Sequence, residues 1–419
     1  MRCCSVISNP VTRYHCSNQE GAIPMAIAQR VRQHMQAASW IRGMFEQGIQ
    51  LKQQYGADHV YDFSLGNPVL EPPPQFYAAL HRLVSHPRPG MHRYMPNVGY
   101  PETRAAIAAQ LARETGAPCT ADHIVMVVGA AGGLNVVMKT LLDPGDEVMI
   151  FSPYFVEYHF YVENYQGVAK VVATDAHFNL DLEAMAQALS PCTKMVLINS
   201  PNNPSGVVYP AATMQALGVL LRHKQAEFGT QIYLVSDEPY KKLLYDGLTY
   251  PEVYPYYDNS IMVTSHAKDL ALPGERIGYI ATNPACADVH ELQDGLSFAN
   301  RTLGFVNAPA LMQHVVTQLQ GVTIDMSQYA RKRDLLCTNL AAMGYQFVKP
   351  QGGFYLFPRT PIPDDVAFVK SLLQRRILTV PGRGFGTPGY FRIAYCVEDD
   401  TIERAFDGFR EVAREYGLS

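Results

Sequence analysis

Short apolar runs alternate with longer stretches of helical periodicity through the middle of the chain. The pattern predicts strands at residues 124–128, 147–151, 169–172, 195–198, 231–236 and 261–264. Around and between them it predicts helices at residues 102–114, 134–142 and 211–227. The predicted strands are apolar without strict alternation, which is typical of parallel strands covered by helices on both faces. We therefore predict an α/β fold built on a mainly parallel sheet.

The pattern changes after about residue 300, which predicts a smaller α+β domain. Helices are predicted at residues 308–320, 327–343, 364–376 and 400–416, and short strands at 353–357 and 390–395. We predict a tail or mis-assigned start at 1–24, an N-terminal segment at 25–65 that joins the small domain, a large domain at 66–300 and a small C-terminal domain at 301–419. Apolar side chains around Trp40 and Phe45 could cover a binding site or pack on the small domain, and we favour packing.

Composition narrows the function classes. The chain has 419 residues, 47% of them hydrophobic and 17% charged, which is ordinary for a globular enzyme. A net charge of −4 without any basic run argues against a nucleic-acid partner, and no apolar stretch is long enough to span a membrane. The eight cysteines form no C-x-x-C pair and no His/Cys cluster at metal-ligand spacing. We therefore expect reduced thiols, a cytoplasmic location and no metal site.

Residues with reactive or anion-binding groups follow four of the predicted strands. A glycine-rich turn at 129–133 follows one strand, the loop 199–206 another, Asp237 a third, and the segment 265–268 a fourth. Parallel sheets bind ligands at the carboxyl ends of their strands. We therefore expect these four segments to form one site.

Lys268 is the most informative of these residues. It lies three residues after Ser265 and eight before Arg276, and this spacing resembles that of the lysine that forms a Schiff base with pyridoxal phosphate. The serine hydroxyl and the guanidinium would then hold the phosphate. The turn at 129–133 supplies small residues and backbone donors at a helix N-terminus for the same anion, although it lacks the dinucleotide-binding G-x-G-x-x-G pattern. The alternatives are a solvated loop lysine and a turn that is tight only for packing.

The ring of such a cofactor makes two further demands. A carboxylate must keep the ring nitrogen protonated, and Asp237 is placed for that role. Tyr240 and Asn203 can hydrogen-bond the 3-oxygen of the ring. Taken alone, an aspartate at a strand end is more often a helix cap or turn former, and Tyr240 could simply pack.

Together these motifs resemble the class I/II aminotransferases, which are fold-type-I pyridoxal phosphate enzymes. The resemblance covers about residues 25–419 and rests on the order and spacing of the glycine-rich turn, residues 199–206, residues 236–240 and Ser265-x-x-Lys268 with Arg276. It implies a seven-stranded, mainly parallel sheet between helices, with a smaller α+β domain. It also implies transfer of an amino group between an α-amino acid and a 2-oxo acid by a ping-pong mechanism.

The resemblance assigns roles residue by residue. Lys268, Asp237 and Tyr240 match catalytic residues, and Asn203 matches a residue that binds both cofactor and substrate. Arg392 matches the arginine that binds the substrate α-carboxylate, and Gly66 the loop that approaches it. Further matches are the phosphate-turn residues Ala130 and Ala131, the ring-stacking aromatic Phe155, and Tyr94, which reaches the neighbouring subunit's phosphate and so implies a homodimer with shared sites.

Substrate choice and reaction type stay open at this level. Some aspartate aminotransferases have a lysine in the phosphate turn that helps to hold a second carboxylate, where this chain has Ala131. Arg301 could read a substrate side chain, although a surface position is the default. A C–S lyase or related elimination enzyme could use the same fold. A transcription regulator with a ligand-sensing domain of this kind would need a helix-turn-helix module, and none is recognised before residue 25.

Overall fold

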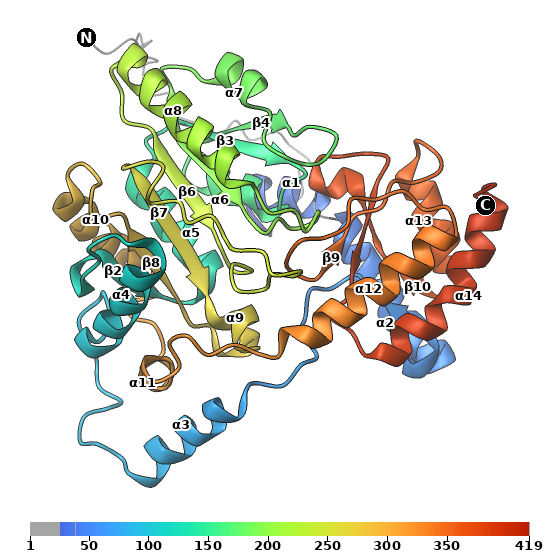
Figure 1. The fold of residues 1–419 in the computed structure, drawn as a ribbon, viewed down its shortest axis with the longest axis horizontal. Helices are drawn as coiled ribbons and strands as arrows, with labels where there is room; N and C mark the ends of the chain where they lie inside the picture. The colour runs from blue at the N-terminus through green and yellow to red at the C-terminus, as the bar shows by residue number, and fades with distance from the viewer. Residues whose placement is uncertain (1–25, 38, 419) are drawn as a thin grey trace.

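The computed structural model describes residues 26–37 and 39–418. The prediction for residues 1–24, and the one for the side chains around Trp40 and Phe45, lie outside the described part. A seven-stranded sheet in the order β2-β8-β7-β6-β5-β3-β4 forms the centre of the larger part (Figure 1). Its strands are β2 (Ile124–Val127), β3 (Glu147–Ser152), β4 (Val168–Ala173), β5 (Thr193–Asn199), β6 (Tyr233–Asp237), β7 (Ser260–Ser265) and β8 (Gly278–Thr282).

The sheet is mainly parallel, which confirms the predicted fold class. Strands β4, β3, β5, β6 and β7 run parallel, while β8 pairs antiparallel with both β7 and β2. The apolar pattern did not predict β8, because it follows directly on the polar segment around Arg276.

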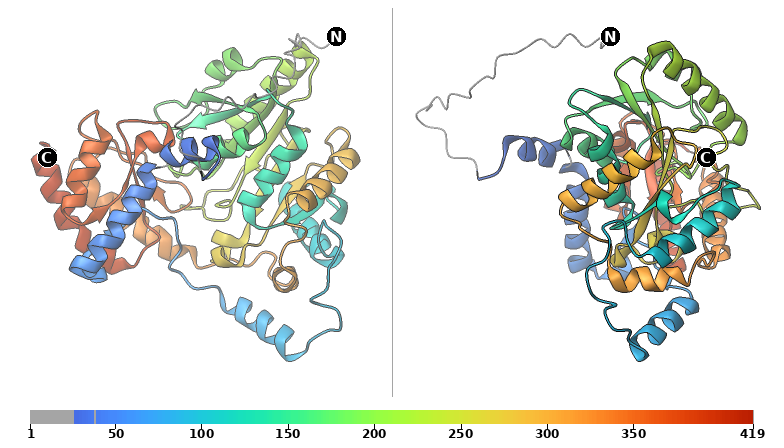
Figure 2. Two further views of the ribbon diagram at one scale, coloured as in Figure 1. Left: turned by 180° about the vertical axis from the view of Figure 1, so that it is seen from behind. Right: turned by 90° about the vertical axis from the view of Figure 1, so that its left-hand side faces the viewer.

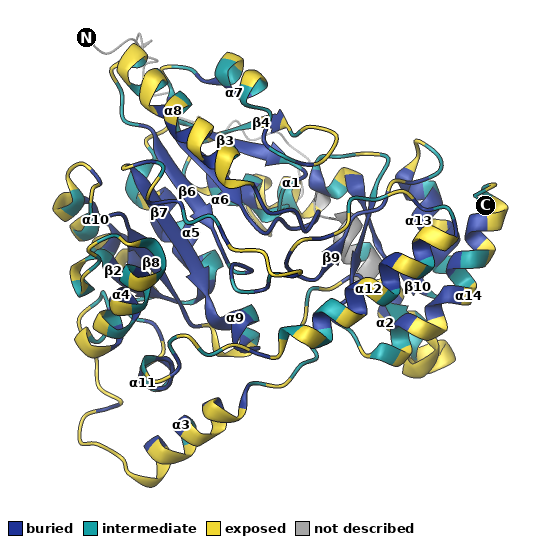
Figure 3. Ribbon diagram, viewed as in Figure 1, coloured by how far each residue is buried: buried dark blue, intermediate teal, exposed yellow. Residues whose placement is uncertain are grey.

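Both faces of the sheet are covered, as Figure 3 shows by the buried strands. Ile124 and Met126 of β2 pack in the core cluster on one face, whereas Val125 and Val127 pack in the cluster on the other. Successive side chains of a strand point to opposite faces, so strands that are apolar at every position must be covered twice. This double cover holds the carboxyl ends of the strands in fixed relative positions.

Helices surround this sheet, including the three that were predicted. They are α3 (Pro74–Ser85), α4 (Pro101–Thr115), α5 (Gly129–Leu141), α6 (Glu157–Asn164), α7 (Leu182–Ala188), α8 (Ala211–Phe228), α9 (His266–Asp269), α10 (Val289–Thr302) and α11 (Ala310–Thr317). Met312 and Val315 of α11 belong to the sheet's core cluster, although α11 lies beyond the predicted boundary at residue 300, and the domain limits stay a prediction. None of the described helices is long and apolar enough to cross a membrane.

The smaller part joins the N-terminal segment to the C-terminal helices (Figure 2). Tyr61 of β1 pairs in parallel with Ile377 of β10, and a side chain on Gly48 of α2 would meet Leu378. A three-stranded sheet in the order β11-β12-β9 completes this part. Its elements are α2 (Ser39–Tyr55), β1 (Tyr61–Asp62), α12 (Met326–Ala342), β9 (Tyr355–Leu356), α13 (Asp365–Gln374), β10 (Ile377–Leu378), β11 (Val380–Pro381), β12 (Phe391–Ala394) and α14 (Asp399–Glu415), with 3₁₀ turns at Ala57–His59 and Gly382–Phe385. Helix α1 (Gln29–Ala37) contacts α6 of the larger part through His34 and Glu163, and the 3₁₀ turns at Ala121–His123 and Pro273–Glu275 also belong to the larger part.

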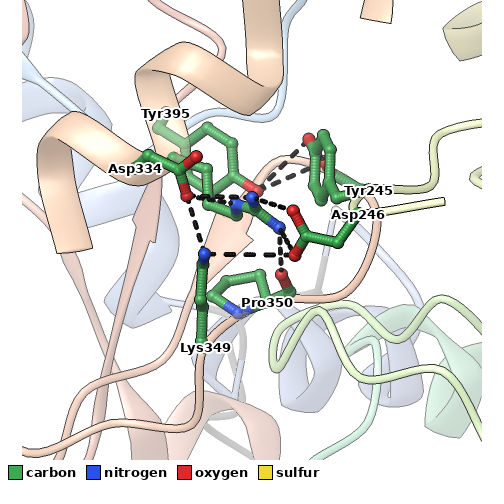
Figure 4. Close-up of polar contacts among 8 residues, drawn as sticks. Tyr245, Asp246, Asp334, Lys349, Pro350 and Tyr395 are labelled. Atoms are coloured by element: carbon green, nitrogen blue, oxygen red, sulfur yellow. Dashed lines mark hydrogen bonds and ion pairs between the residues drawn. The ribbon is translucent and has the colours of Figure 1, made fainter. Parts of the chain in front are cut away.

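Arg333 of α12 is buried and binds the loop that follows β6. Figure 4 labels its partner Asp246 on that loop. The guanidinium of Arg333 donates two hydrogen bonds of 2.8 Å to the carboxylate of Asp246 and one of 3.1 Å to the carbonyl of Pro350. It also lies 4.5 Å from the ring centroid of Tyr245. Bidentate pairing fixes orientation as well as distance. The loop after β6 and the turn before β9 are therefore held together, and both segments continue into the wall of the cavity described next.

Candidate active site

A cavity of about 340 Å³ lies at the carboxyl ends of β5, β6 and β7, where the two parts of the chain meet. The sheet side contributes Ala130, Ala131, Leu134, Phe155, Val156, Glu157, Asn199, Asn203, Asp237, Pro239, Tyr240, Ser265, Ala267, Lys268, Pro273 and Arg276, and the other side contributes Ser64, Leu65, Gly66, Tyr355, Phe385 and Arg392. With the exception of Tyr94, every residue assigned to the site from the sequence lines this cavity. The four strand-end segments therefore meet in one place.

Lys268 enters the cavity from α9, the single helical turn after β7. Its Nζ donates a hydrogen bond of 2.7 Å to the carbonyl oxygen of Gly66 and lies 5.2 Å from the ring centroid of Phe354. Burial lowers the pKa of Lys268 to about 8, and the charges of Arg276 and Arg392 act in the same direction. A lowered pKa increases the fraction of uncharged amine near neutral pH, and the uncharged amine is the form that acts as nucleophile or base.

Asp237 ends β6 at the bottom of the cavity. Its Oδ2 accepts a hydrogen bond of 2.5 Å from the hydroxyl of Tyr158, while its buried Oδ1 has no hydrogen-bond partner within the described chain. Burial raises the pKa of Asp237 to about 7, against the hydrogen bond from Tyr158, which lowers it. A buried carboxylate oxygen without a partner is costly, so this atom is suited to an N–H donor on a ligand.

One end of the cavity is built for an anion. Ala130 and Ala131 lie in the first turn of α5, where backbone N–H groups have no partner inside the helix. Gly129 has φ 78°, and a Cβ there would lie 2.7 Å from Nη2 of Arg276. Ser265 brings a hydroxyl from the end of β7 to the same cavity. Backbone donors, a hydroxyl and a guanidinium together fit a phosphate group.

The loop after β5 joins the middle of the cavity to Asp237. Asn199 accepts a hydrogen bond of 2.7 Å from the backbone N–H of Asn203 and donates one of 2.9 Å to the carbonyl of Asp237. The hydroxyl of Tyr240 lies 3.0 Å from that of Tyr355. Phe155 packs edge-on against Tyr158, with centroids 5.6 Å apart. Polar groups and aromatic side chains thus line this part of the cavity.

Arg392 of β12 lines the cavity from the smaller part of the chain. Its Nη1 donates to Oδ1 of Asn203 at 3.0 Å and its Nη2 to the carbonyl of Ser64 at 2.6 Å. Its buried Nε has no partner among the residues that the structure describes. Gly66 makes room for the hydroxyl of Tyr355, with which a Cβ at position 66 would clash. A partly unsatisfied buried guanidinium is suited to a carboxylate ligand.

Two residues singled out in the sequence lie away from the cavity. Tyr94 is 90% exposed on the molecular surface. Arg301, at the end of α10, is exposed and lies 5.4 Å from the ring centroid of Phe298. The surface position was the default expectation for Arg301, and the geometry gives it no contact with the cavity.

Among the residues that sequence reasoning did not assign are Glu157 and Tyr355 of the cavity wall and Tyr158, which binds Asp237. Glu157 and Tyr158 follow Phe155 closely, and a helical reading of that segment would have placed Tyr158 on the same side as Phe155 three residues on. Tyr355 lies on β9 in the smaller part of the chain, and its approach to Tyr240 depends on how the two parts pack. No local sequence pattern reports that packing.

Comparison with known proteins agrees with the geometry. Residues 58–409 match the family model for class I and II aminotransferases. The aspartate/prephenate aminotransferase of Thermus thermophilus is 33% identical over 379 residues, which cover 87% of this chain and 93% of that protein. A solved amino transferase from Eubacterium rectale has a TM-score of 0.90 and 37% identity, covering 94% and 99% of the two chains. Aspartate aminotransferase from Thermus thermophilus with maleate has a TM-score of 0.81 and 30% identity, covering 93% and 100%.

The chain belongs to the class I and II aminotransferases. It is a fold-type-I transaminase that depends on pyridoxal phosphate and acts on amino acids and 2-oxo acids. The resemblance seen in the sequence is confirmed, and the names of the relatives favour transamination over elimination.

Proposed function

We propose that the cavity is the active site of the transaminase, with Lys268, Asp237 and Tyr240 as its catalytic residues. One observation carries this proposal: an amine with a lowered pKa and a buried carboxylate oxygen without a partner share one cavity, between an anion site and a carboxylate site. Perturbed titratable groups that converge in a cavity are characteristic of catalytic sites.

The residues present fit pyridoxal phosphate. Ala130, Ala131, Ser265 and Arg276 offer donors for the phosphate. Oδ1 of Asp237 would accept a hydrogen bond from the ring nitrogen, and Phe155 would pack against the ring.

Asn203 and Tyr240 line the same cavity and would bind the 3-oxygen of the ring. Because Oδ1 of Asn203 already accepts from Arg392, its Nδ2 is the atom left to donate to the ring's 3-oxygen. Tyr240 donates to the same oxygen, with Tyr355 orienting its hydroxyl. These donors favour the anionic form of that oxygen.

Bound pyridoxal phosphate supplies an electron-withdrawing ring that stabilises the negative charge left on the substrate Cα when the α-proton is removed. Lys268 would hold the cofactor, and its uncharged Nζ is the group that would take up the substrate α-proton and return it. Asp237 keeps the ring nitrogen charged throughout. Arg392 and Gly66 hold the substrate α-carboxylate, so that the Cα–H bond faces Lys268.

The reaction type is tested by giving the holoenzyme an amino acid without any oxo acid. A transaminase then releases one equivalent of 2-oxo acid and stops with the cofactor in its amine form, which changes its absorbance. An elimination enzyme would release product over many turnovers and keep the aldehyde form. Multiple turnovers without an acceptor would therefore contradict the proposal.

Replacing Arg392 with lysine is expected to lower kcat/KM by about a hundredfold, mainly through KM, because an ammonium cannot bind the α-carboxylate in the bidentate manner. Steady-state kinetics against an amino acid series measures this. Arg410→Lys is the matched control, since Arg410 lies on the surface of α14 and pairs only locally with Asp407. An equal loss of kcat/KM in the two variants would show that Arg392 does not bind the substrate α-carboxylate.

We also infer a homodimer in which Tyr94 reaches the phosphate bound by the neighbouring subunit. The support is the family pattern around Tyr94, together with its 90% exposure, which a side chain buried by a partner would explain. Tyr94→Phe is expected to weaken cofactor binding by about tenfold, because one charge-assisted hydrogen bond is lost. Cofactor titration measures the affinity, and sedimentation measures the oligomeric state. A monomeric protein would contradict the homodimer, and an unchanged cofactor affinity in Tyr94→Phe would contradict the contact between Tyr94 and the phosphate.

We also infer a cytoplasmic location. The support is the scattered placement of the cysteines, which favours reduced thiols over a disulfide framework. Fractionation of the source cell tests it.

A further inference from the structure

Glu157 is the acidic residue of the cavity wall that the mechanism leaves without a role. It is the first residue of α6 and lines the cavity beside Phe155 and Val156. The other acidic residue on the described wall, Asp237, is engaged with Tyr158 and the ring nitrogen. Glu157 is therefore the acidic residue of the described wall that is left to interact with a substrate side chain.

The carboxyl of Glu157 is buried but incompletely satisfied. Its Oε2 has no hydrogen-bond partner within the residues described. Burial raises the pKa of Glu157, although its own backbone N–H and the charge of Arg392 act to lower it. Arg392 directs two of its hydrogen bonds to Asn203 and Ser64 instead. A ligand that brings an N–H donor would satisfy Oε2, and one that brings a second carboxylate would be repelled.

The cations on the wall are already assigned. Lys268, Arg276 and Arg392 are the basic residues that line the cavity in the described part of the chain. They serve the proton transfer, the phosphate and the α-carboxylate in turn. Arg301 is exposed, and Ala131 takes the place where some aspartate aminotransferases have a lysine. Within one subunit, the described wall therefore offers a distal carboxylate no further cation, and Glu157 would oppose it.

We propose that Glu157 is a specificity-determining residue that selects amino acids whose side chains end in a nitrogen donor, an amide or an amine, over dicarboxylic amino acids. The proposal rests on the proposed active site. It separates this chain from the relatives named for aspartate, to which it is similar over most of its length. Discrimination by like-charge repulsion against the wrong ligand is a general route to specificity.

The test compares half-reactions of the holoenzyme with glutamine, lysine, aspartate, glutamate and alanine. The wild-type protein is expected to convert its cofactor with glutamine or lysine at least about tenfold more efficiently than with aspartate or glutamate. Glu157→Gln keeps the shape and removes the charge, so this preference is expected to shrink at least about tenfold, while the rate with alanine, whose methyl group is too short to reach Glu157, changes little.

A binding measurement gives an independent readout. Maleate is a dicarboxylate that does not react, and it is expected to bind Glu157→Gln more tightly than wild type in an absorbance titration. Glu163→Gln is the matched control, because Glu163 lies on the same helix but contacts His34 outside the cavity. It should leave both the preference and maleate binding unchanged.

The outcomes separate the two proposals. A wild-type protein that prefers aspartate or glutamate, or a Glu157→Gln variant that slows every amino acid equally, would overturn the role of Glu157 while the transaminase site stands. A holoenzyme that converts its cofactor with none of the five amino acids would instead overturn the proposed active site.

Discussion

Lys268→Ala is expected to lower turnover by at least about ten-thousandfold, because it removes both the covalent attachment of the cofactor and the base that moves the α-proton. The fold should survive. The amine makes a hydrogen bond to the carbonyl of Gly66, and its loss leaves an acceptor that cavity water can reach. Steady-state transamination measures the first effect, and circular dichroism with thermal unfolding measures the second.

The matched control is Lys370→Ala, which removes an exposed lysine from α13. It should leave turnover and cofactor content unchanged. Borohydride reduction of the holoenzyme should attach the cofactor to the peptide that contains Lys268, and the alanine variant should show no such adduct. Substantial turnover in Lys268→Ala, or an adduct at another lysine, would show that a residue other than Lys268 supplies the catalytic amine.

Much of the site could be predicted because strand ends are visible in the sequence. Apolar runs that end in Asp237 or in Ser265 locate the carboxyl edge of the sheet, and parallel pairing brings such ends together whatever the loops do. The turn that begins α5 is visible for the same reason, since Gly129 marks a backbone conformation and a close approach that other residues would not allow.

What the sequence could not give depends on how the two parts of the chain pack. The orientation of Tyr240 by Tyr355 joins residues that are 115 positions apart, and the bond between Lys268 and Gly66 spans 202. Glu157 follows a segment that was noted only for Phe155, and its missing hydrogen-bond partner appears only when the cavity is built. Strand β8 was missed because its sequence follows a polar turn and its pairing is antiparallel.

Asp237→Ala is expected to lower kcat by about a thousandfold while part of the cofactor binding remains. The loss in kcat follows from the charge, because without a carboxylate at this atom the ring nitrogen loses its proton and withdraws electrons less strongly from the substrate. Binding persists because the phosphate donors of α5, Ser265 and Arg276 are not touched. Cofactor titration and single-turnover kinetics measure the two effects separately.

Further variants at Asp237 and at its hydrogen-bond partner Tyr158 separate the effect of the Asp237 charge from the effect of packing. Asp237→Asn keeps the volume and an acceptor for Tyr158 but not the charge, so its kcat should fall nearly as far as that of the alanine variant. Tyr158→Phe keeps the charge and removes the hydrogen bond to Oδ2, so its effect on kcat should stay within about tenfold. Asp237→Glu should recover part of the rate. If Tyr158→Phe lost as much activity as Asp237→Ala, Asp237 would act by orientation, and near-normal rates in Asp237→Ala would exclude it from the mechanism.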